Sequence, residues 1–136
     1  MNLSLLDNFA DEYLRKPQGR GVFLAGVVLG YIAGCQVESE RDIKNAPLFK
    51  QIQFGRMDMK SLKKHLARVP QLLAAYSESI AASQLVSALA AEAGRLMLMG
   101  GERELGVEGN FAFTVGFGNA TSYFWQIFKK DDKGDE

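Results

Sequence analysis

The residues best suited to chemistry in this sequence are basic, and they are concentrated between Lys44 and Arg68. The chain of 136 residues is neutral as a whole, with 16 basic and 16 acidic side chains. The basic residues of this stretch are Lys44, Lys50, Arg56, Lys60, Lys63, Lys64 and Arg68. Its one acidic residue is Asp58, so the stretch carries +6 and the remainder carries −6. Charge separated in this way is typical of a protein that presents a basic face to an anionic partner.

The second half of this stretch is predicted to be a helix that begins at Asp58. The Asp58 carboxylate can accept hydrogen bonds from the free N–H groups of the first turn, where it also meets the positive end of the helix dipole. Helical periodicity places Lys60, Lys63, Lys64 and Arg68 on one arc, and Met59, Leu62, Leu66 and Val69 on the opposite arc. A solvated helix face gives a similar stripe. Ordinary surface helices mix charges of both signs, however, so the scarcity of acidic partners favours an interaction surface.

Other chemistry has little support. His65 and Cys35 are the only histidine and the only cysteine, and their separation in sequence predicts neither a zinc cluster nor a Cys/His nucleophile pair. The glycines around Phe117 lack the lysine and hydroxyl residue of a phosphate-binding loop. We therefore expect no enzymatic activity, no metal and no cofactor.

Composition predicts one globular domain. Hydrophobic residues make up 47% and charged residues 24% of the chain, which is ordinary for a soluble protein. A single cysteine excludes an internal disulfide and suits a reducing cytoplasm. No secretory signal is visible, and the uncharged run 21–37 is too short and too rich in glycine for a membrane span. We expect one helical-bundle domain over residues 1–130 and a charged, disordered tail over 131–136.

The elements that must position the basic residues are predicted to be helices. The expected fold is an all-α, compact bundle of about five helices. Pro70 either kinks the basic helix or opens a new one. Alternation of large apolar residues from Phe111 to Phe117 also fits a strand, so a strand remains an alternative there. The expected helices span 2–14, 21–37, 48–56, 58–69, 70–99 and 108–128.

Within the apolar segment 21–37, Gly26, Gly30 and Gly34 recur every four residues and therefore share one helix face. Each glycine costs about 1 kcal/mol of helix propensity, so tertiary contacts must compensate. In membranes this spacing marks helix dimers. In a bundle it predicts a face against which another backbone packs closely.

The order of these motifs resembles a known family. GVFLAGVVLGYIAGCQ, then NAPLFKQIQFGRMDMKSLKKHLARVPQLLAAY, then a final aromatic segment with GFGNATSYF, are similar to the C-terminal helical region of the large subunit of type I CRISPR Cascade complexes, most closely the I-B lineage. In such systems this region is also made separately, as the small subunit. A chain of this length, which starts at Met1 just before the first helix, looks like that small subunit.

The resemblance implies a helical bundle that packs side by side with further copies of itself, against the backbone and large subunits of the complex. The implied role is to stabilise the hybrid of CRISPR RNA and target DNA, together with the displaced strand, through basic residues on nucleic-acid backbone. The implied site comprises Arg20, Lys50, Arg56, Lys60, Lys63, Lys64 and Arg68.

Two other hypotheses remain open. The basic ridge could meet an acidic protein partner in a purely helical scaffold, without nucleic acid. The glycine-spaced helix could instead associate with a membrane.

Overall fold

A computed structural model describes residues 1–76, 80, 82–101 and 104–129 of the chain. Within these residues the fold is entirely helical, with no strand, which confirms the predicted all-α class. The α-helices are α1 (Pro17–Cys35), α2 (Pro47–Gln51), α3 (Met59–Ala67), α4 (Val69–Ala75), α5 (Ser83–Gly100), α6 (Gly106–Gly118) and α7 (Ala120–Phe128). Three short 3-10 helices accompany them, η1 (Ser4–Asn8), η2 (Glu12–Arg15) and η3 (Glu40–Asn45).

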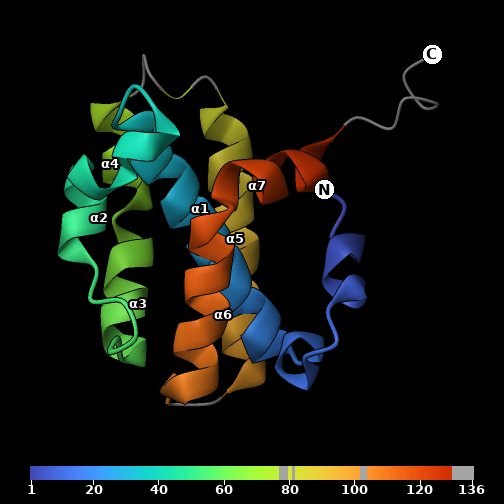
Figure 1. The fold of residues 1–136 in the computed structure, drawn as a ribbon. Coiled ribbons are helices and arrows are strands. Elements are labelled where there is room, and N and C mark those ends of the chain that lie inside the picture. The colour runs from blue at the N-terminus through green and yellow to red at the C-terminus, as the bar shows by residue number, and fades with distance from the viewer. Residues whose placement is uncertain (77–79, 81, 102–103, 130–136) are drawn as a thin grey trace, which may run out of the picture.

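Helix α1 forms the centre of the bundle, as the ribbon in Figure 1 shows. It packs against α5 on one side and α6 on the other, and α7 crosses its C-terminal half. Helices α2, α3 and α4 lie along one side of this stack, while η1 and η2 lie on the opposite side (Figure 1). Ten consecutive residues of α1, from Gly21 to Gly30, are buried, which explains why the segment is apolar on all faces.

The glycine face of α1 does what its spacing predicts. A Cβ atom on Gly26 would lie 2.4 Å from the carbonyl oxygen of Phe113, and one on Gly30 would lie 2.6 Å from that of Phe117. Gly116 of α6 makes the matching close contact with α1, because a Cβ atom there would lie 2.4 Å from the Phe23 carbonyl oxygen. The backbones of α1 and α6 therefore approach to distances that only glycine permits. Gly34 has no comparable contact.

The N-terminal prediction is wrong in two respects. The expected helix over 2–14 is instead η1 followed by η2, two short 3-10 helices. Pro17 begins α1, which therefore starts before the expected helix 21–37, and its missing N–H has no helical partner to lose there. Arg20 consequently lies in the first turns of α1.

Several predicted helices are divided or shortened in the structure. The expected helix 48–56 is the shorter helix α2, which begins at Pro47 and ends at Gln51. Pro70 lies in the first turn of α4, so it opens a new helix. The segment 70–99 contains α4 and α5, and the residues between them at 77–79 and 81 lie outside the described part of the chain. Gly101 ends α5 with φ +70°, as expected for a glycine stop.

The aromatic segment 108–128 is helical, so the strand alternative is wrong. It is divided at Asn119 into α6 and α7, and α7 turns back so that Phe124 stacks on Tyr31 of α1 with ring centroids 4.1 Å apart. After Gly101 the structure describes the chain again from Glu104 onward. The predicted tail 131–136 lies wholly outside the described residues.

Helix α1 is long and apolar enough to cross a membrane by length and composition. However, 83% of its most apolar window is buried inside the bundle. This burial is characteristic of a core helix, and it explains the hydropathy without a bilayer.

Candidate nucleic-acid interface

Helix α3 carries the densest group of cations, and its start is fixed by two anchors. The Asp58 carboxylate accepts from the Ser61 backbone N–H at 2.7 Å, the predicted N-cap bond. This hydrogen bond is the main cause of a lowered pKa for Asp58. The Asp58 side chain is therefore committed to the helix start as an anion.

The second anchor is Asn110 of α6, which is buried and holds Met57 by both of its backbone groups. The Met57 N–H donates to Asn110 Oδ1 at 2.9 Å, and Asn110 Nδ2 donates to the Met57 carbonyl at 2.9 Å. Asn110 Nδ2 also donates to the Gly106 carbonyl at 2.9 Å. One amide thus fixes the entry to α3 against the body of the bundle. It was not predicted, although an asparagine in an otherwise apolar helix was a signal that could have pointed to it.

The apolar and basic arcs of α3 are arranged as predicted. Met59, Leu62 and Val69 are buried and Leu66 is partly buried, whereas Lys60, Lys63 and Lys64 are exposed. Arg68 at the end of the helix is half-buried and donates to the Gln51 side-chain oxygen of α2. This contact ties α3 to α2, so that exposed Lys50 belongs to the same side of the molecule.

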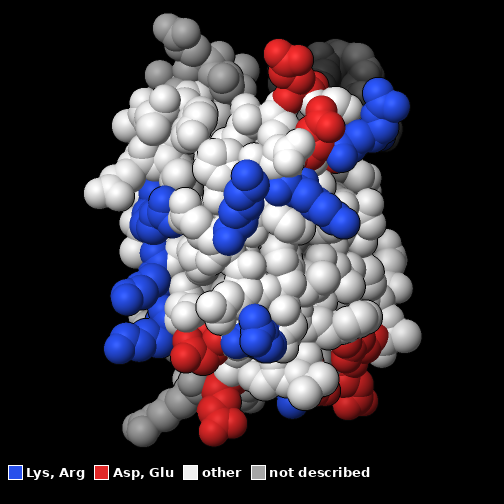
Figure 2. All heavy atoms as spheres, turned by 60° about the vertical axis from the view of Figure 1, so that its left-hand side comes forward, with Lys and Arg blue, Asp and Glu red and all other residues white. Residues whose placement is uncertain are grey.

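The cations between Lys44 and Arg68 lie outside the ion pairs found in the described part of the chain. Among the described residues, ion pairs join Arg20 to Asp7 and Arg95 to Glu92, and none involves this stretch. Figure 2 brings forward the side that carries α2 and α3 and shows Lys and Arg side chains along one edge and across the face. Acidic side chains gather at its upper and lower ends (Figure 2). The exposed side chains of Lys60, Lys63 and Lys64 can therefore approach an external anion.

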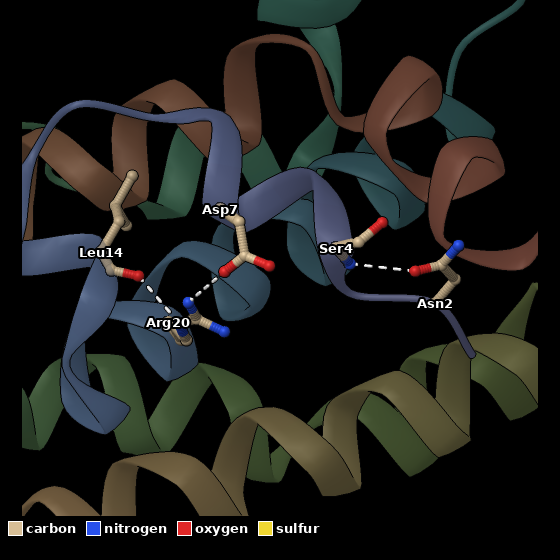
Figure 3. A network of polar contacts seen from close by, with 5 residues as sticks. All are labelled: Asn2, Ser4, Asp7, Leu14 and Arg20. Carbon is tan, nitrogen blue, oxygen red and sulfur yellow. Dashed lines mark hydrogen bonds and ion pairs between the residues drawn. The ribbon is translucent and has the colours of Figure 1, made fainter.

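Arg20 is placed differently from the other predicted site residues. Its guanidinium donates to an Asp7 carboxylate oxygen at 2.7 Å and to the Leu14 carbonyl at 2.9 Å, as Figure 3 shows. These bonds hold η1 and η2 onto the start of α1, on the side of the bundle opposite α3 (Figure 1). The structure thus brings together Lys50, Lys60, Lys63, Lys64 and Arg68, with Arg56 on the loop before α3, and leaves Arg20 apart.

His65 adds no positive charge to this surface at neutral pH. Burial, and then the neighbouring Arg68 charge, lower its pKa. The Nδ1 atom of His65 is buried and has no hydrogen-bond partner among the described residues. The charge of the surface therefore comes from lysine and arginine alone.

The remaining reactive groups do not converge. Burial raises the pKa of the half-buried Cys35 thiol, and burial together with Cys35 raises the pKa of Tyr31. In the described ranges, no group of three or more His, Cys, Asp or Glu side chains is placed to hold a metal ion. The grouping with a clear chemical character is the basic surface.

Comparison with known proteins gives one finding. The sequence pattern of the family described as CRISPR-associated protein TM1802 (cas_TM1802) C-terminal domain matches residues 3–131. No curated protein and no solved structure matches the chain. The match covers nearly the whole sequence, from η1 through α7, and includes every residue of the basic surface. This chain therefore belongs to the CRISPR-associated TM1802 C-terminal domain family.

Proposed function

We propose that the chain is the non-catalytic small subunit of a CRISPR RNA-guided surveillance complex of the Cascade type, of the I-B lineage. In this role it binds nucleic-acid backbone and stabilises the guide–target hybrid and the displaced DNA strand. It works in the cytoplasm, without a cofactor, beside the backbone and large subunits and further copies of itself. The observation that carries the proposal is the row of exposed lysines on α3, for which the described residues show no ion pair, in a CRISPR-associated domain.

The chemistry of the surface suits this role. Lysine and arginine contacts to phosphate supply affinity without regard to sequence. A subunit that must accept any target requires such contacts, because base pairing with the guide reads the sequence. Neutral overall charge gives one copy weak affinity, and repetition along an assembly raises avidity.

The direct test is charge reversal on the outer part of the surface. Arg56→Glu, Lys60→Glu and Lys64→Glu together should weaken binding of the complex to target DNA. Four engaged phosphates give a log–log salt slope of about −2.8 on a single strand, and loss of three leaves about −0.7. Fluorescence anisotropy with labelled single-stranded DNA at several salt concentrations measures both the affinity and the slope.

A control variant reverses three positive charges outside this surface. Arg15, Lys16 and Lys129 are exposed and lie outside this surface, so reversing all three to Glu should leave affinity and slope close to the unmodified protein. Equal losses in the two triple variants would mean that net charge, not this surface, governs binding. An unchanged slope in the first variant would refute the proposed contact.

Membership of a surveillance complex has its own test. Co-expression with the other subunits of the candidate effector, followed by sizing and RNA extraction, should recover this chain together with CRISPR RNA. Recovery of the complex without this chain at every salt concentration would contradict the small-subunit role.

The alternative is a helical scaffold whose basic face binds an acidic protein. The exposed apolar side chain of Leu98, which lines one groove with the lysines of α3, favours some protein contact on this side. Nuclease treatment separates the two cases, since a purely protein assembly survives it and a nucleic-acid-dependent one releases the chain.

A further inference from the structure

A cavity lies beside the C-terminal half of α1, where α6 ends and α7 begins. It has a volume of about 360 Å³, within the range of about 300–1,000 Å³ that is usual for small-molecule pockets. Residues of α1, α6 and the first turn of α7 line one side, and residues of η3 and α2 line the other. The cavity is large enough for a small planar ligand, and it lies outside the lysine row of α3.

Glycine forms part of the cavity lining. Gly34 of α1 and Gly118 at the end of α6 both contribute to it. Outside the helix backbone, the nearest atom to a Cβ on Gly34 would be Thr121 Oγ1 at 4.0 Å, and a Cβ on Gly118 would meet nothing within 4 Å. Unlike Gly26, these two glycines are therefore not required by close packing of backbones, and the space beside them is open.

Aromatic and aliphatic side chains form one wall of the cavity. Phe117 of α6 is buried, and Phe49 of α2 packs edge-on against it with ring centroids 6.0 Å apart. Phe49 is only partly buried, so part of its ring remains accessible from the cavity. Ile43 of η3 extends the apolar surface. This wall offers an aromatic face to a flat ligand.

Other lining residues are polar. Glu40 belongs to η3, and Asn119 and Thr121 lie where α7 begins. In the described part of the chain, these three side chains make no hydrogen bond or ion pair. A carboxylate only accepts hydrogen bonds, whereas an amide and a hydroxyl both donate and accept, so the lining suits a ligand with donors and acceptors along its edge. The Glu40 carboxylate would repel an anion, so the cavity itself does not suit a phosphate.

Two ligands combine an apolar body with a polar edge, namely a nucleobase and the basic side chain of a partner protein. The surroundings of the cavity favour the nucleobase. Lys50 follows Phe49 on α2, Lys44 follows Ile43 on η3, and both lysines are exposed. These cations would repel a basic side chain, whereas they would attract the phosphates on either side of a nucleotide.

Helix α2 also connects the cavity with the basic surface. It contributes Phe49 to the cavity, and its Gln51 accepts a hydrogen bond from Arg68 at the end of α3. A single strand that contacts the lysines of α3 can therefore continue along α2 and reach the cavity. Unstacked bases of single strands are commonly held on aromatic side chains.

We propose that the cavity holds one unstacked base of a single-stranded nucleic acid. The base lies against Phe49, and its polar edge meets Glu40 and Asn119. The adjoining phosphates contact Lys44 and Lys50 outside the cavity. Adenine, cytosine and guanine carry an amino group that donates to Glu40, whereas thymine and uracil present carbonyl oxygens there, so bases with an amino group are preferred. The inference rests on the proposed function, because the strand is the one that the basic surface binds.

Filling the cavity is the most direct test. Gly34→Leu places a side chain in open space, so it should lower the affinity for a labelled short oligodeoxycytidine by about fivefold or more. The salt slope should stay unchanged, because no phosphate contact is lost. Gly94→Leu on α5 is the matched control, since a Cβ there likewise finds open space and Gly94 lies outside the cavity. Fluorescence anisotropy measures affinity and slope, and thermal unfolding checks that each variant folds.

A second test removes the aromatic face and retains the apolar volume. Phe49→Leu should weaken binding by about three- to tenfold. Phe128→Leu, which changes a partly buried phenylalanine outside the cavity, should leave binding unchanged. This pair decides the question even if Gly34→Leu fails to fold.

The preference among bases tests the contact with Glu40. The unmodified chain should bind oligodeoxycytidine about two- to fivefold more tightly than oligodeoxythymidine, and Glu40→Leu should bring this ratio close to one. Glu38→Leu removes the same charge from an exposed residue outside the cavity, so it should keep the ratio. Equal affinity of the unmodified chain for the two oligonucleotides would overturn the assigned base contact.

A free nucleotide separates the two possible sources of a base. Cytidine monophosphate should compete with the oligonucleotide only at millimolar concentrations, because it lacks the further phosphate contacts of a strand. Competition in the micromolar range would assign the cavity to a free nucleotide and overturn the proposal.

The outcomes distinguish this inference from the proposed function. If Gly34→Leu and Phe49→Leu both leave the affinity unchanged while charge reversal on α3 lowers it, the cavity holds no base and the proposed function stands. A chain that binds no single-stranded DNA at any salt concentration would overturn both.

Discussion

Asn110 positions the basic surface without belonging to it. Its amide satisfies both backbone groups of Met57, the residue before the Asp58 cap, and a third carbonyl at Gly106. Buried backbone groups that lose their partners are costly, and water cannot easily replace this amide. The orientation of α3 relative to α6 therefore depends on one side chain.

Asn110→Ala should lower the free energy of unfolding by about 1–3 kcal/mol, because it leaves buried polar groups of Met57 unsatisfied. Urea denaturation measures this loss. Asn119→Ala is the matched control, since Asn119 is exposed and makes no side-chain cap bond, and its effect should stay within about 0.5 kcal/mol. Equal effects at the two positions would contradict the role assigned to Asn110.

His65 makes stability depend on mildly acidic pH. Its pKa is lowered in the folded protein by burial and by Arg68, so the unfolded chain takes up a proton first as the pH falls below about 6.5. The His65 contribution to the free energy of unfolding is therefore constant above that pH. It declines as the pH falls further, until the pH reaches the lower pKa of His65 in the folded protein. His65→Gln should flatten this decline while leaving the neutral value similar, as measured by thermal unfolding across this pH window. A decline of equal slope in the variant would show that other groups cause it.

At the scale of elements, the pairing of α1 with α6 is the most specific contact in the core. Gly26→Ala would place a methyl group 2.4 Å from a backbone carbonyl, which cannot move as a flexible side chain would. We expect this change to cost about 1–3 kcal/mol through overpacking, more than the helix propensity it gains. Gly94→Ala on α5 meets nothing within 4 Å and should instead stabilise by roughly 0.4–1 kcal/mol. Chemical denaturation should show a lower free energy of unfolding for Gly26→Ala and a higher one for Gly94→Ala. An increase for both variants would refute the close contact between α1 and α6.

The sequence predicted elements well where periodicity was strong and poorly where the chain turned. The arc of α3, its Asp58 cap and the glycine face of α1 are local patterns, so they could be read directly. The division of the aromatic segment at Asn119 could not, because that break lets Phe124 reach Tyr31, a contact far along the chain. Pro17 and Pro47 each begin a helix, whereas the expected helices began after them, at 21 and 48.

At the scale of the whole molecule, burial of α1 bears on the membrane hypothesis. The bundle already covers the helix that has the composition of a span. We therefore expect the purified chain to remain in the supernatant when mixed with neutral phospholipid vesicles and sedimented. Pelleting with such vesicles at moderate salt would contradict this expectation and reopen the hypothesis.

Most of the candidate site could also be predicted at this scale, because charge counting needs no structure. The separation of +6 from −6 along the chain located the basic surface. The exception is Arg20. The sequence around it does not indicate that its guanidinium would donate hydrogen bonds to Asp7 and to the Leu14 carbonyl. Partners of that kind depend on the path of η1 and η2, which periodicity did not define.

One bond at the periphery has a consequence for chain topology. The backbone N–H of Asn2 donates to the carbonyl of Ile127 at 2.8 Å, so the first residues lie against the end of α7. A short peptide linker from Lys129 to Met1 would therefore close the backbone into a circle at little entropic cost. In such a cyclic chain the seam lies away from α3, and a circular permutant opened at an exposed turn should keep the same connectivity of contacts.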